Sequence, residues 1–151
     1  MYKSFRMEVI DLSYVKSVAD GDEELIKSLI EIFKEQLSEY REGLNKLYDE
    51  EDWHGMALLA HKAKSSILSM GMTELGEAMK KLEMLCKYIC VQLQSVDLQT
   101  AERFSEQLDS APEYIRLWVS DNNSKKNIQD LIFFYILQSE KAKSDLKELH
   151  Y

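Results

Sequence analysis

The sequence predicts an all-α protein, and three observations support this prediction. Only five glycines and one proline occur in 151 residues, fewer than a chain of short strands and tight turns needs. The apolar share of 45% is enough for one core in a chain of this length. Apolar residues recur at alternating steps of three and four over long segments, which is the period of an amphipathic helix. We therefore expect a single domain over residues 1–151.

The N-terminal part of the chain predicts a short helix followed by a long one. The short helix covers residues 11–19 and ends at Asp20-Gly21, a pair that favours a helix C-terminus. Asp22 can cap the next helix. The apolar stripe of that helix is Ile26, Ile30, Phe33, Leu37, Tyr40, Leu44 and Leu47.

Two further long helices follow in the middle of the chain. Asp52 is the predicted cap of the first, which ends at Gly71, and Thr73 is the predicted cap of the second. The stripe of the first is Trp53, Met56, Ala60, Ala63, Ile67 and Met70. The stripe of the second is Leu75, Met79, Leu82, Cys86, Ile89 and Leu93. Successive long helices with short links are expected to pack antiparallel.

The last helix is separated from these by an insertion at residues 94–127. Within it, residues 98–108 can form a helix, Ser110-Ala-Pro-Glu can open another, and residues 121–126 are a predicted loop. The stripe of the last helix is Ile128, Ile132, Tyr135, Ser139, Ala142, Leu146 and Leu149. The expected fold is an antiparallel four-helix bundle with a short N-terminal helix and a helical insertion before the last helix.

The charge and the apolar runs exclude several classes of protein. The chain has 19 basic and 27 acidic residues and a net charge of −8, which opposes binding to nucleic acid or to an anionic membrane. The longest apolar run, residues 131–137, is much shorter than the ~20 residues that span a bilayer. The first ten residues, MYKSFRMEVI, lack the apolar stretch of a signal peptide. We expect a monomer in the cytoplasm.

Cys86 and Cys90 are the only cysteines, and they lie one helical turn apart. A metal site would need further Cys or His ligands, which this segment does not offer. We interpret them as small buried thiols, and we expect neither a metal site nor a cofactor.

His61 is the residue with the strongest indication of chemistry. Each residue of a helix advances about 100°, so His61 lies about 100° from Ala60 and points away from the core. Its neighbours on the outer face are small or apolar, with one lysine and no cluster of carboxylates. They are His54, Leu58, Ser65 and Leu68, with Ala57 and Lys64 slightly to one side.

An exposed neutral imidazole is a good nucleophile, since its unperturbed pKa of about 6.5 leaves most rings neutral at cytosolic pH. Lys64 could hydrogen bond to the oxygens of a phosphoryl group on His61. The small side chain of Ser65 would let a partner approach the ring. These residues indicate a histidine that accepts and passes on a phosphoryl group.

The segment around His61 resembles the histidine-containing phosphotransfer (HPt) domain of bacterial multistep phosphorelays. The resemblance rests on Asp52-Trp53, on Ala60-His-Lys-Ala-Lys-Ser-Ser66, on Gly71 and Leu75, and on Leu82-Glu83. That family has a histidine, a lysine three positions on, a small residue that is usually Gly, often a Ser, and a Gly at the helix end. Ser65 stands here in place of the usual Gly. The resemblance covers about residues 11–87 and the last helix, and residues 94–127 depart from the family pattern.

The resemblance implies a phosphocarrier that takes a phosphoryl group from an aspartate of one receiver domain and delivers it to an aspartate of another. His61 would be the carrier and Lys64 the stabiliser of the phosphoryl charge. The face that docks the receiver would consist of Leu58, Lys62, Ser65 and Leu68, with His54 and Ala57 at its edge. Mg²⁺ would be bound by the receiver. The chain has no Gly-rich nucleotide motif, so we expect no autokinase activity.

Two other classes of protein remain open. A helical adaptor could keep the bundle and bind signalling partners without being phosphorylated. A metal or cofactor protein with a four-helix bundle would need inward-facing ligands such as a Glu-x-x-His pair. No Glu stands three positions before His54 or His61, so we rank this class last.

Overall fold

The computed structural model describes residues 9–151 of the chain. Residues 1–8, which belong to the segment where we expected no signal peptide, lie outside the described residues. From residue 9 onward the chain forms helices and no strands, which confirms the all-α prediction. None of the described helices is long and apolar enough to cross a bilayer. The helices are α1 Ser13–Ala19, α2 Glu23–Asp49, α3 Trp53–Ser69, α4 Thr73–Gln92, α5 Leu98–Asp109, α6 Glu113–Asp121 and α7 Lys125–Glu148.

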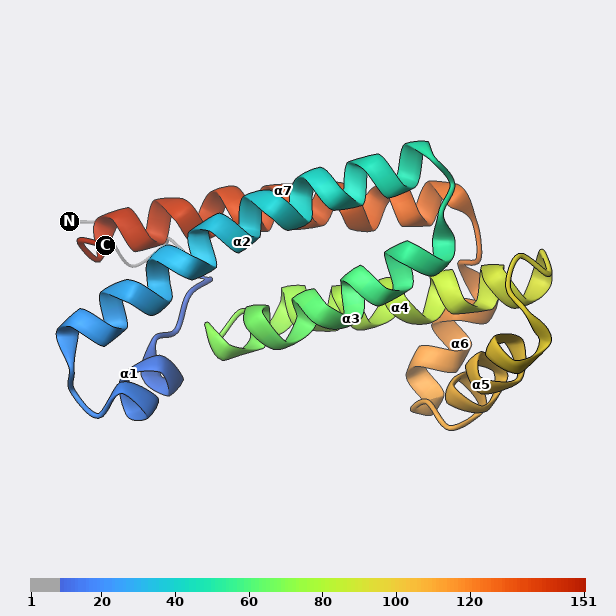
Figure 1. The fold of residues 1–151 in the computed structure, drawn as a ribbon, viewed down its shortest axis with the longest axis horizontal. Helices are drawn as coiled ribbons and strands as arrows, with labels where there is room; N and C mark the ends of the chain where they lie inside the picture. The colour runs from blue at the N-terminus through green and yellow to red at the C-terminus, as the bar shows by residue number, and fades with distance from the viewer. Residues whose placement is uncertain (1–8) are drawn as a thin grey trace.

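The four long helices form an antiparallel bundle, as the sequence predicts. α3 packs against α2 and α4, and α7 packs against the same two helices from the other side. Neighbouring helices in this ring run in opposite directions (Figure 1). α1 packs on α2 at one end of the bundle, whereas α5 and α6 pack on α4 at the other end (Figure 1).

Two of the three predicted capping side chains, Asp22 and Asp52, fix a helix start, and the third, Thr73, does not. Asp22 accepts hydrogen bonds from the backbone N–H of Glu24 and Leu25 at the start of α2, and Asp52 accepts one from Gly55 at the start of α3. Thr73 is wrong as a cap, because it is the first helical residue of α4. Its hydroxyl donates to the carbonyl of Gly71 at 3.5 Å.

The apolar stripes of the four long helices meet in one core. Trp53, the predicted core methionines and most of the stripe residues are buried. Leu47 and Ile89 are only partly buried, and Leu93 and Leu149, which lie at the C-caps of α4 and α7, are exposed. Cys86 and Cys90 are free and buried, as predicted.

Residues 94–127, the segment that we predicted as an insertion, contain two helices, α5 and α6. The predicted helix at residues 98–108 corresponds closely to α5, and Pro112 directly precedes α6. The predicted loop at residues 121–126 is shorter than expected. It is shorter because Ser124 accepts a hydrogen bond from the backbone N–H of Asn127, so that α7 begins at Lys125.

Candidate functional site

His61 lies midway along α3 with its ring directed away from the core. The side chain is 67% exposed, whereas the preceding Ala60 is fully buried. The prediction that His61 faces outward is therefore confirmed. An exposed ring on a helix that is fixed on its other face can meet a reacting group without movement of the backbone.

The packing of α4 on α3 sets the surroundings of His61. A Cβ atom at Gly76 would lie 2.2 Å from Cδ2 of Leu68, so the side chain of Leu68 lies directly against this glycine of α4. Glu83 lies seven positions after Gly76 on α4, and His61 lies seven positions before Leu68 on α3. Glu83 and His61 are also in contact. The two contacts belong to one antiparallel register, about two helical turns apart.

Glu83 holds the ring of His61 by its Nδ1 atom. The carboxylate oxygens of Glu83 lie 3.1 Å and 3.2 Å from Nδ1, and the side chain of Glu83 is only 3% exposed. An ionised carboxylate can only accept a hydrogen bond, so Nδ1 of the neutral ring must carry the proton and donate it. The lone pair of the neutral ring is then on Nε2, the nitrogen that is free to react.

Two lysines compensate the buried charge of Glu83. Lys87, one turn further along α4, donates a hydrogen bond from Nζ to Oε2 at 2.6 Å, and its side chain is 8% exposed. Nζ of Lys64 lies 3.9 Å from Oε1 of the same carboxylate. A buried carboxylate without such partners would be strongly destabilising. The ion pair with Lys87 therefore allows a negative charge to persist beneath the histidine.

The structure exposes most of the residues that the sequence places around His61. Leu58, Lys62 and Ser65 are exposed, and Leu68 is 45% exposed although it also contacts Gly76. Lys64 is partly exposed on the side of α3 that faces α4. These side chains surround the ring on the same face of α3.

The prediction that Ala57 belongs to the docking face is wrong. We placed it at the edge of that face, but it is fully buried. On the helical wheel it lies between the core stripe and His61. α4 packs closely on this side of α3, so the buried arc of α3 is wider than the core stripe alone indicates.

His54 is less accessible than predicted, because α5 covers one side of it. Its ring contacts Phe104 of α5 edge to face, with 5.6 Å between the ring centroids. His54 is half-buried as a result. No local sequence pattern indicates this contact, since the two residues are far apart in the chain.

Glu83 is the functional residue that sequence analysis missed. We described the surroundings of His61 as small and apolar, without carboxylates, because only the residues of its own helix were considered. A signal existed in the predicted α4 helix. Glu83 follows the core residue Leu82 and stands four positions before Lys87, a spacing typical of an ion pair on a helix.

An apolar groove lies on the opposite side of α3 from Glu83. It is formed by α1, α2 and α3, and its exposed apolar side chains are Tyr14, Val18 and Ile32. Ser66 and Ser69 of α3 also line it.

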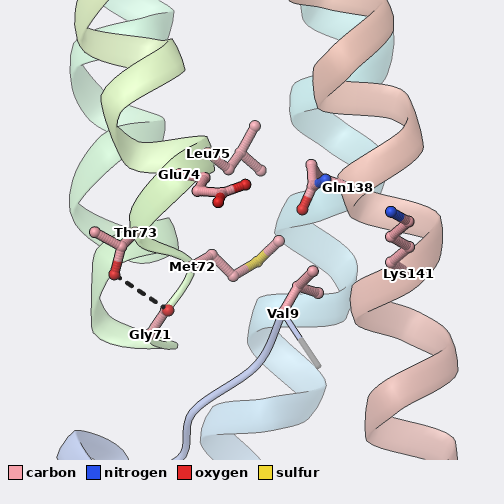
Figure 2. A pocket seen from close by; sticks show the side chains of 8 residues that line it. All are labelled: Val9, Gly71, Met72, Thr73, Glu74, Leu75, Gln138 and Lys141. Atoms are coloured by element: carbon pink, nitrogen blue, oxygen red, sulfur yellow. Dashed lines mark hydrogen bonds between the residues drawn. The ribbon is translucent and has the colours of Figure 1, made fainter. Parts of the chain in front are cut away.

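A second hollow lies at the turn between α3 and α4, where Gln138 and Lys141 of α7 and Val9 face the start of α4 (Figure 2). Figure 2 shows the hydroxyl of Thr73 turned toward the carbonyl of Gly71 in its wall. His61 and Glu83 are not among its lining residues. Within residues 9–151, no group of three or more His, Cys, Asp or Glu side chains is placed to hold a metal ion.

Comparison with known families gives one match. A family model described as "Hpt domain" matches residues 28–116, which is more than half of the chain. The matched segment includes α3, α4 and α5 together with most of α2 and the first turn of α6. No curated protein and no solved structure gives a significant match.

Proposed function

The chain belongs to the Hpt domain family, and from this premise we propose that His61 carries a phosphoryl group between the aspartates of receiver domains. The family implies phosphotransfer in phosphorelays and a role as phosphocarrier. The observation that supports His61 as the carrier is its hydrogen bond from Nδ1 to the buried carboxylate of Glu83, which leaves Nε2 unprotonated and accessible.

In the proposed reaction, the lone pair of Nε2 attacks the phosphorus of an aspartyl phosphate on the receiver. A nitrogen–phosphorus bond forms while the bond between phosphorus and the aspartate oxygen breaks, and the aspartate leaves with the electron pair. The ring of His61 gains positive charge in this step, and its Nδ1 proton stays hydrogen bonded to Glu83. Transfer to a second receiver is the same reaction in reverse.

Glu83 and Lys64 would stabilise opposite charges in this reaction. The negative carboxylate of Glu83 stabilises the positive charge that develops on the imidazole, and it costs no reorganisation because it is already in place. Lys64 lies one turn along α3 and can direct its ammonium group at the phosphoryl oxygens. Any Mg²⁺ would be bound by the receiver.

The receiver would dock on the exposed face of α3 around His61. Leu58, Lys62, Ser65 and Leu68 supply this face. A receiver seated on it would cover the ring. Such cover would exclude water and strengthen the interactions with the phosphoryl group.

The test is to incubate the protein with a phosphorylated receiver domain or with phosphoramidate, and to measure label that is acid-labile and base-stable. His61→Gln should abolish labelling and keep the helical circular dichroism spectrum, because the ring lies outside the core. His54→Gln is the matched control and should label normally. Labelling of His61→Gln at the wild-type rate would show that another residue is the carrier.

The same assay separates the phosphocarrier from the alternative adaptor, which would bind a receiver without acquiring label. ATP alone should give no label, because we propose that the chain has no autokinase activity. Wild-type protein that binds a receiver but accepts phosphate from neither donor would favour the adaptor.

A further inference from the structure

Phe104 anchors the insertion beside the histidine site. It is 2% exposed and comes from α5, whose buried residues are Thr100 and Phe104. Nζ of Lys87 lies over its ring, 5.4 Å from the centroid. The ring of His54 contacts another side of it. Phe104 therefore covers the end of α3 and α4 that adjoins the Lys87–Glu83 ion pair.

These contacts form a continuous path from the insertion to His61. Phe104 contacts Lys87, Lys87 donates to Oε2 of Glu83, and Glu83 accepts from Nδ1 of His61. We propose that Phe104 is a positioning residue for phosphoryl transfer, by which α5 holds Glu83 against Nδ1 of His61 and so keeps the proton of the neutral ring on that nitrogen. This inference rests on the proposed function of His61 and adds a role for the insertion.

The physical basis is the removal of Lys87 from water. Phe104 replaces water around the ammonium group, and the face of an aromatic ring attracts a cation. An ion pair is stronger where water is excluded, so Lys87 stays on Oε2 and Glu83 remains ionised and fixed. In this state Glu83 can only accept the proton of Nδ1.

Water beside Lys87 would weaken this arrangement. The buried carboxylate of Glu83 would then lack full compensation and would rotate away from the ring. A rotated Glu83 no longer favours a proton on Nδ1, so the neutral ring can carry its proton on Nε2, which then has no lone pair to react. This change lowers the population of reactive rings.

The insertion also offers a matched control. Trp118 of α6 makes a similar contact with a lysine of α4, with Nζ of Lys81 at 5.3 Å from the ring centroid. Within residues 9–151, Lys81 makes no hydrogen bond or ion pair with Glu83, whereas Lys87 is the closest partner of Glu83. Trp118→Leu and Phe104→Leu thus remove the same kind of contact, and only the second should affect His61.

The experiment measures the nitrogen chemical shifts of His61 in the unphosphorylated protein by NMR at neutral pH. These shifts distinguish the two neutral tautomers from the imidazolium ion. In Phe104→Leu the ratio of the neutral Nδ1–H form to all other forms should fall roughly two- to tenfold, the range expected for a contact of this type. Labelling by phosphoramidate should slow in proportion to the fall in the fraction of rings in the Nδ1–H form, a factor no larger than the fall in this ratio. Trp118→Leu should match wild type in both measurements.

An unchanged ratio in Phe104→Leu would overturn the inference, as would an equal change in Trp118→Leu, which would indicate general loosening. If Phe104→Leu does not fold, Lys87→Met replaces it, because this variant removes the ammonium group and leaves the aromatic ring. The same fall in the Nδ1–H form is expected, and no fall would overturn the proposal. Failure of wild-type protein to accept phosphate would instead contradict the role of His61, which the tautomer measurement does not assume.

Discussion

Substitution of Glu83 by Gln removes the negative charge beside His61 while it keeps the size of the side chain. The amide oxygen of Gln can still accept a hydrogen bond from Nδ1, so the ring need not move. What is lost is the interaction between a carboxylate and the positive charge that develops on the imidazole. We expect phosphoryl transfer to be slower in this variant, with phosphoramidate and with a receiver alike.

The geometry sets the size of the effect. A pair of unit charges about 4 Å apart, at an effective dielectric constant near 20, interacts by about 4 kcal/mol. The ring is 67% exposed, so water screens much of this interaction. The difference between a charged and a neutral hydrogen bond is about 1–1.5 kcal/mol, which corresponds to a rate roughly five- to tenfold lower.

The assay must separate this effect from a loss of stability. Glu83→Gln leaves Lys87 buried without its carboxylate, which costs about 3–5 kcal/mol when one partner of such a pair is removed. The double variant Glu83→Gln with Lys87→Met has no buried charge at this position and should recover most of the stability in urea unfolding. Its labelling rate should stay low, because the carboxylate is still absent.

Glu74→Gln, at an exposed position of the same helix, is the control for a change of net charge. It should label at the wild-type rate. If Glu83→Gln labels as fast as wild type while it remains folded, the carboxylate does not assist transfer. If the double variant regains both stability and rate, the carboxylate acts only through the fold.

Three further predictions concern single positions. Lys64→Ala should slow transfer roughly ten- to a hundredfold by removing a charge-assisted hydrogen bond, with little change in the urea midpoint, and a rate within twofold of wild type would exclude Lys64. Ser65→Gln should slow transfer from a receiver more than from phosphoramidate, and equal loss or no loss would contradict a role in docking. Gly71→Ala should destabilise by more than about 2 kcal/mol in urea unfolding, because its Cβ would lie 2.4 Å from Cβ of Asp11 at φ +76°. Gly21→Ala, at φ +80° with open space around it, should lose only the stability that a non-glycine residue costs at a positive φ. Equal losses of stability in the two variants would show that the contact with Asp11 is not the cause.

The bundle could be predicted because its determinants are local. Steps of three and four between apolar residues define the core stripes of α2, α3, α4 and α7. Acidic residues placed before two of these stripes predicted the caps at Asp22 and Asp52. His61 could be placed outside the core for the same reason, since its angle from Ala60 follows from helix geometry alone.

The partners of His61 could not be predicted because they depend on which side of α3 another helix covers. The periodicity of α3 gives the direction of the core and does not say how far α4 extends around it. That limit explains both errors at the site, since Ala57 was placed on the surface, and Glu83, although part of the family resemblance, was not placed beside His61. The contact of Phe104 with His54 and Lys87 depends on how the insertion folds back, and no local pattern encodes it.

Small residues at the interface of α3 and α4 connect the packing of the core to the chemistry of the site. Ala57, Ala60 and Ala63 are buried on α3, and Gly76 faces it from α4. Short side chains let the helix axes approach, and a buried carboxylate on α4 can then reach a ring on the outer face of α3. The 3.1 Å hydrogen bond of His61 thus depends on residues that never touch it. The proposed reactivity of Nε2 therefore depends in part on small buried residues that take no direct part in the chemistry.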